Sequence, residues 1–224
     1  MSTGGLSVVR IQSNATYIFA ADSARGRVPF VQDLGVSFAQ EMSLVDLSIV
    51  PGDRTVWIGR QGTLKFSDAR TIVITSIAGG AHELMVGVEG STEDAVDVLN
   101  EVWSKLGELA RESAIALTDA PGAFTYQTTA IVRLPRSFRD VMPLLATLYD
   151  YAREALGETL LDRPGVMPFR VELPLTIGAR GVSVSRSIVI EPRFTSTDDD
   201  QVFFTVSPLR SGAHLEMLRK ALVE

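Results

Sequence analysis

Residues 71–112, TIVITSIAGGAHELMVGVEGSTEDAVDVLNEVWSKLGELARE, hold the most regular pattern in the chain. Two β-prone runs, Thr71–Ile77 and Glu83–Val88, are joined by a turn-forming sequence, Ala78-Gly79-Gly80-Ala81. A segment with helical spacing follows from Glu93 to Glu112, and its charged residues fall on the face opposite its apolar residues. We therefore predict a hairpin with an amphipathic helix laid across one face.

The predicted helix has one apolar face that we expect to pack on the hairpin. Leu99 and Leu106 lie on that face, so both side chains should be buried. Lys105 lies on the opposite face and should remain in solvent. Glu93 and Asp94 fall in the first turn, where negative charge stabilises the start of a helix.

Shorter β-prone runs precede and follow this unit. Near the N-terminus, Ser13-Asn14 is predicted to be a tight turn between two strands, and apolar positions between Val31 and Met42 indicate a helix that Gly35 weakens. Ser211 is expected to cap a last helix. The predicted strands are Leu6–Gln12, Thr16–Ala21, Leu44–Val50, Thr55–Ile58, Phe124–Leu134, Phe169–Ile177, Val182–Phe194 and Val202–Val206.

A second long helix is predicted over Val141–Leu156, with Asp140 as its N-cap and Gly157 as its stop. Apolar residues recur through it with helical spacing, which predicts one buried stripe. The members of that stripe are Val141, Leu145, Leu148, Ala152, Ala155 and Leu156.

The strands and helices are too clustered to alternate as regular βαβ units, and no repeat of fixed period occurs. We therefore predict an α+β fold with a largely antiparallel sheet and amphipathic helices packed on one face. Residues 1–62 form a β-rich segment that we expect to be an oligomerisation region, and residues 63–224 form the α+β core. A single continuous domain is the alternative to that division.

The composition limits the possible functions. A net charge of −6 weighs against binding to nucleic acid, which needs a basic surface. The chain has no cysteine, which excludes disulfides, thiolate metal sites and a cysteine nucleophile. A cysteine-free chain without a secretory signal or a long apolar run leads us to expect a soluble cytoplasmic protein that does not enter a membrane.

Two histidines occupy similar settings, His82 beside Glu83 and His214 two residues before Glu216. They could act together as an acid and a base, or as ligands with those carboxylates. Alternatively, one lies in a hairpin turn and the other in the first turn of a helix. Closely spaced metal ligands are missing, so we expect neither a metal nor another cofactor.

Arginines on predicted loops form a second candidate site. Arg25 and Arg27 share one glycine-containing loop, and Arg180 lies in the turn before Val182. The planar guanidinium suits recognition of carboxylate or phosphate. The alternative is that these arginines are simply solvated.

No nucleophile elbow, phosphate-binding loop or zinc spacing occurs in the sequence. We therefore predict a non-enzymatic interaction or assembly protein whose partner is a second copy of itself or another protein. The alternative is an enzyme or small-molecule-binding protein with a site assembled from distant residues such as Asp22, Arg25, His82 and His214.

Overall fold

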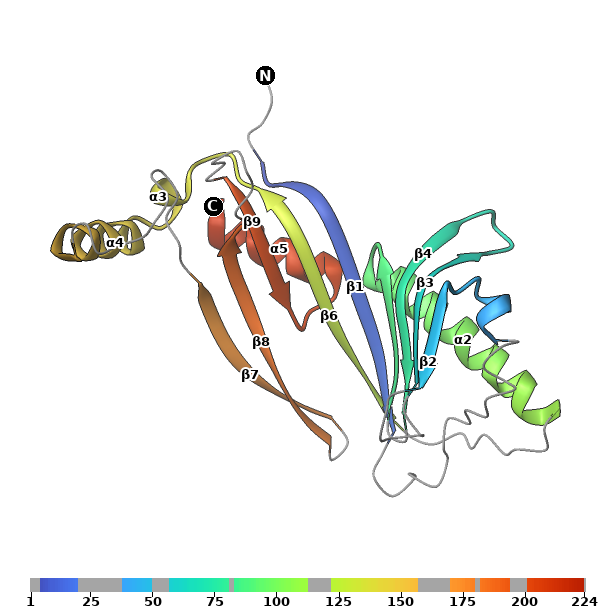
Figure 1. The fold of residues 1–224 in the computed structure, drawn as a ribbon. Coiled ribbons are helices and arrows are strands. Elements are labelled where there is room, and N and C mark those ends of the chain that lie inside the picture. The colour runs from blue at the N-terminus through green and yellow to red at the C-terminus, as the bar shows by residue number, and fades with distance from the viewer. Residues whose placement is uncertain are drawn as a thin grey trace.

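The computed structural model describes residues 5–19, 38–49, 57–80, 83–112, 122–156, 170–179, 182–193 and 201–223. These ranges form a sheet and several helices (Figure 1). A short helical turn at residues 38–41 precedes the second strand. The elements are β1 (Ser7–Phe19), β2 (Asp46–Ile49), β3 (Trp57–Lys65), β4 (Thr71–Gly79), β5 (Glu83–Glu89), α2 (Thr92–Glu112), β6 (Gly122–Arg133), α3 (Phe138–Val141), α4 (Pro143–Leu156), β7 (Val171–Ala179), β8 (Val182–Pro192), β9 (Val202–Ser207) and α5 (Ser211–Leu222).

The described strands form one nine-stranded sheet in the order β2-β3-β4-β5-β1-β6-β9-β8-β7, and every neighbouring pair is antiparallel. The predicted α+β class with a largely antiparallel sheet is confirmed. The N-terminal strand β1 lies at the centre of the sheet, between β5 and β6. No described helix is both long enough and apolar enough to cross a membrane.

β1 is a single continuous strand, so the predicted turn at Ser13-Asn14 is wrong. Both residues pair with β6 in an unbroken register, Ser13 opposite Thr128 and Asn14 opposite Gln127. The Ser13 hydroxyl also donates to the Gly90 carbonyl at 2.8 Å. Pairing with a strand on each side satisfies the backbone at these residues, and this long-range pairing overrides their local preference for a turn.

The chain folds as two halves of similar topology about an approximate twofold axis between β1 and β6. Each half has a central strand (β1 or β6), a two-stranded arm (β3–β4 or β7–β8), an inner strand (β5 or β9) and a helix (α2 or α5). Ser13 and Thr128 face each other across the axis and donate to Gly90 and Leu209 respectively, each at 2.8 Å. Both helices lie on one side of the sheet, which we call the helix face (Figure 1).

The predicted hairpin with an overlying helix is present as β4, β5 and α2. Leu99 and Leu106 are only 3% and 2% exposed, as the helical spacing predicted. They join a core that includes Trp57 from β3 and Phe38 from the short helical turn, whose rings meet edge to face at 5.4 Å. This core lies under the first half of the sheet.

A second core lies under the other half, where α5 packs on β6, β8 and β9. Phe203 and Leu218 are fully buried there, and Ala146 anchors α4 to the same cluster. The burial predicted for the rest of α4 is wrong for three residues of the stripe, because Leu148, Ala152 and Ala155 are exposed. α4 projects beyond the edge of the sheet in Figure 1, so among the described residues its packing partners lie along its inner flank.

Candidate interaction surface

Most of the residues that the sequence marked as candidate ligands lie outside the described part of the chain. These residues are Asp22, Arg25, Arg27, His82 and Arg180. The site assembled from Asp22, Arg25, His82 and His214 therefore stays a prediction. Among the described residues, no cluster of three or more metal-ligating side chains occurs.

His214 is described and is completely buried on α5. Its Nε2 lies 2.9 Å from Thr205 Oγ1, and its Nδ1 lies 2.6 Å from Ser207 Oγ. The Thr205 hydroxyl donates to the Ala130 carbonyl, so it accepts from Nε2–H, and Nδ1 then accepts from the Ser207 hydroxyl. Both ring nitrogens are therefore engaged with strand β9.

The environment of His214 keeps its ring uncharged. Burial lowers the pKa of His214 from 6.5 to about 4, so the imidazole is neutral at pH 7. Glu216, which the sequence placed nearby, is paired with Lys220 at 2.8 Å on the exposed side of α5. Within the described chain, His214 thus joins α5 to the sheet.

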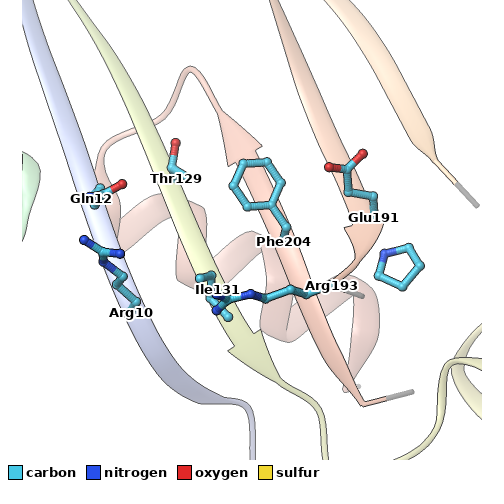
Figure 2. A pocket seen from close by; sticks show the side chains of 8 residues that line it. Arg10, Gln12, Thr129, Ile131, Glu191, Arg193 and Phe204 are labelled. Carbon is cyan, nitrogen blue, oxygen red and sulfur yellow. The ribbon is translucent and has the colours of Figure 1, made fainter. Parts of the chain in front are cut away.

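A shallow depression lies on the face of the sheet opposite α2 and α5 (Figure 2). Sequence reasoning did not identify it, because its residues come from β1, β6, β8 and β9 and meet only through strand pairing. Arg10 and Gln12 from β1 lie on one side, and Glu191 and Arg193 lie on the other. Thr129, Ile131, Pro192 and Phe204 complete its lining.

Most charges around this depression are already compensated. Arg10 is paired with Glu89, and Glu191 is paired with Arg170 at 3.1 Å. Arg193 is exposed, and its side chain extends toward Ile131 in Figure 2. The polar side chains of this depression are open to solvent, so they suit weak polar contacts. No two of the described side chains there form an acid–base pair or an activated nucleophile.

α4 carries a more distinctive surface. Leu144, Leu148 and Tyr151 are 72%, 57% and 75% exposed, and their spacing places them on one side of the helix. We call these three residues the α4 stripe. Ala146 lies on the other side of α4 and is buried against the second core. The helix therefore has an inner apolar flank that anchors it and an outer apolar flank in solvent.

α4 is held in place beside α3. Arg139 of α3 donates two hydrogen bonds to Asp150 of α4, at 2.7 and 2.9 Å, which is the bidentate arrangement of guanidinium with carboxylate. Sequence reasoning recognised the helix but assigned Leu148 to its buried side. The sequence did contain one signal of a second apolar flank. The helix has more apolar residues than one narrow stripe can hold, because Leu144 and Leu145 cannot both belong to the same stripe.

No protein-family model, no curated protein sequence and no solved structure matches this chain.

Proposed function

We propose that this protein is a non-enzymatic interaction protein that assembles with a second copy of itself through the α4 stripe. The observation that carries the proposal is the exposure of Leu144, Leu148 and Tyr151 on a helix that projects from the sheet. Single exposed apolar residues are common on proteins, but three on one side of one helix form a contiguous patch. Such patches typically mark interaction sites.

The stripe is complementary to itself. An antiparallel pair of α4 helices centred near Leu148 places Leu144 of one copy beside Tyr151 of the other, and the two Leu148 side chains together. A twofold-symmetric contact of this kind uses the same patch on both copies. α4 spans 14 residues, or about 21 Å, so the contact is small and the dimer should be weak.

The architecture favours α4 over the N-terminal strands as the contact surface. β1 is paired on both sides, so it offers no free edge to a second chain. β2 is an edge strand, but it has only four residues and carries an ion pair between Asp46 and Arg60 at 3.3 Å. Short, charged edges of this kind oppose pairing with another sheet.

Light scattering behind a sizing column tests the proposal over a range of protein concentrations. The wild-type protein should change from a species near 24.3 kDa toward twice that mass as the concentration increases. Leu148→Glu should remain monomeric throughout, because it places a charge in the centre of the contact. Ser104→Glu adds the same charge at an exposed site on α2 and should behave like the wild type. A wild-type protein that is monomeric at every concentration would refute the proposal.

A further inference from the structure

We infer that the second half of the sheet accepts an extended, acidic segment of another protein as an added strand between β6 and β8. This inference goes beyond self-association, because it uses a different surface and a different partner. It rests on the pairing of the strands, on the directions of their backbone groups and on the side chains beside them.

The inner strand β9 covers only part of each neighbour. It pairs with β6 over Thr128–Arg133 and with β8 over Val189–Pro192. Residues 122–127 of β6 and 182–188 of β8 therefore have no described strand on the side of β9. Because β9 lies between these strands and is antiparallel to both, the two uncovered edges face each other beyond its end. The lower ends of β6 and β8 in Figure 1 show this arrangement.

The directions of the backbone groups follow from the register. Leu134 N–H donates to the Gln201 carbonyl, so Leu134 and alternate residues before it direct their backbone groups toward β9. The same alternation continues toward the start of β6, so the backbone N–H and C=O groups of Phe124 and Tyr126 lie on the uncovered edge. Arg193 N–H donates to Val202, which by the same reasoning places the backbone groups of Ser187 on the facing edge of β8.

The first half of the molecule shows how the corresponding arm is closed. There β4 pairs with β5 over Val73–Gly79, leaving only Thr71 and Ile72 without β5 beside them. The turn of that arm is fastened to α2, because Arg70 binds Asp97 at 3.0 Å and lies 3.6 Å from Asp94. The first arm thus remains beside its helix.

The second arm lacks this fastening among the described residues. Aligning Ser211 with Thr92, the first residues of their helices, places Ala213 and Glu216 of α5 at the positions of Asp94 and Asp97. Alanine cannot bind an arginine, and Glu216 is paired with Lys220 on its own helix. On the arm itself, Leu173 and Leu175 are 54% and 38% exposed.

Side chains on the helix face define what an added strand would meet. Phe124 is 41% exposed. Its ring stacks with the Tyr126 ring at a centroid distance of 6.4 Å and meets the Tyr17 ring edge to face at a centroid distance of 5.0 Å. Ile188 lies on the same face of β8, because it alternates with Ile190, which pairs with Thr205 beside His214. Apolar residues at every second position of the added strand would therefore lie between Phe124 and Ile188.

The positive charge on the helix face beside the uncovered edges favours an acidic segment. Arg186 alternates with Ile188, and among described groups it donates only to the neighbouring Ser185 carbonyl, at 3.2 Å. Arg210 stacks over Tyr126 at 4.7 Å and donates to its hydroxyl. Glu93 partly compensates Arg210. The pKa of the Glu93 carboxyl is lowered chiefly by a hydrogen bond with its own backbone, then by hydrogen bonds with Thr92 and Ser211, and also by the charge of Arg210. Arg186 can therefore bind a carboxylate on the added strand, where a glutamate or aspartate replaces one of its apolar residues on the helix face.

Residue-resolved amide hydrogen exchange tests the edge in the full-length protein. In the free protein, Phe124 and Tyr126 should exchange quickly, whereas Thr125 and Gln127, whose N–H groups face β1, should be protected. A short synthetic peptide that alternates valine with threonine, with one central valine replaced by glutamate, should then protect Phe124 and Tyr126. Protection of both amides in the free protein would show that the edge is already filled and would overturn the inference. Failure of the peptide to protect them would overturn it equally.

Two matched comparisons test the chemistry of the partner. Arg186→Gln should weaken binding of the glutamate peptide about tenfold and leave binding of the matching glutamine peptide within about twofold. N-methylation of alternate peptide amides should abolish binding, because it removes the backbone donors. Equal effects of Arg186→Gln on the two peptides would contradict the acidic specificity. Leu148→Glu should bind the peptide like the wild type, which separates this test from that of self-association.

Discussion

Thr92 and Ser211, the first residues of α2 and α5, exchange hydrogen bonds across the approximate twofold axis. Thr92 N–H donates to Ser211 Oγ at 3.3 Å, and Ser211 N–H donates to Thr92 Oγ1 at 3.1 Å. Each hydroxyl thus satisfies a backbone donor of the other helix, which the first turn of a helix cannot satisfy internally. Both residues are buried, so the contact joins the two halves away from solvent.

Substitutions at this contact should destabilise the protein cooperatively. Thr92→Val and Ser211→Ala each leave a buried N–H without its acceptor, so each should lower the free energy of unfolding by about 1–3 kcal/mol. The double substitution should cost less than the sum of the two, because each single substitution already removes the contact between the two hydroxyls at 3.2 Å. Urea melts measure all three. Ser104→Ala, at an exposed site on α2, is the control, and strictly additive losses would show that the two residues act independently.

The central helix offers a direct comparison between its two faces. Leu99→Ala should lower the free energy of unfolding by roughly 2–5 kcal/mol through lost burial and the cavity left behind. Lys105→Ala should leave it nearly unchanged, because the ion pairs of Lys105 with Glu41 and Glu108 are partly exposed to solvent. Similar losses for the two variants in urea melts would contradict the packing of α2 through the face that carries Leu99.

Local pattern was sufficient to predict the unit built from β4, β5 and α2, because each element there agrees with its tertiary setting. The same reasoning failed at Ser13-Asn14, where two neighbouring strands override the turn preference of both residues. The twofold relationship was not predicted either. It depends on contacts such as Thr92–Ser211, between residues far apart in the chain, and the sequence has no repeat that would indicate it.

The buried histidine should make stability depend on pH. The pKa of His214 is about 4 in the folded protein and 6.5 when solvated, so between these values the unfolded chain binds a proton that the folded chain does not. The free energy of unfolding should therefore decrease by up to about 3 kcal/mol as the pH falls from 6.5 to 4. Above pH 6.5 this contribution is fully present.

Chemical denaturation across this pH range, compared with the His214→Gln variant, measures that contribution. The variant should lose the part of the pH dependence that lies between 6.5 and 4, and it should be less stable at pH 7 because it disturbs two buried hydrogen bonds. His82→Gln provides the matched histidine control. An imidazole resonance of His214 that titrates near 6.5 in NMR spectra would contradict the assignment of a neutral, enclosed ring.

The first arm should loosen when its fastening to α2 is removed. Arg70 binds Asp68 and Asp97 at 2.6 and 3.0 Å, and its guanidinium lies 5.1 Å from the centre of the Phe66 ring. These contacts are half exposed, so Arg70→Gln should lower global stability only slightly. Amide exchange in the turn at residues 66–70 should nevertheless accelerate. Arg60→Gln, which removes an ion pair elsewhere on β3, should leave exchange in that turn unchanged.

The two flanks of α4 show why the candidate surface could not be predicted from the sequence. Leu145 and Leu148 have equivalent hydrophobicity, and helical spacing alone cannot show which one faces the core. The choice is made by Ala146, which is buried against the second core and thereby turns Leu148 outward. Such an orientation depends on where α4 meets the sheet, which is a tertiary property.

The cysteine-free sequence allows the most direct measurement of the central claim, that α4 pairs with a second α4. Leu148→Cys introduces the only thiol of the chain, at the centre of the stripe. Under mild oxidation this variant should form a disulfide-linked dimer of twice the 24.3 kDa mass, far faster than Ser104→Cys on the exposed side of α2. Equal, slow cross-linking of the two variants at concentrations where the protein is fully soluble would contradict self-association through α4.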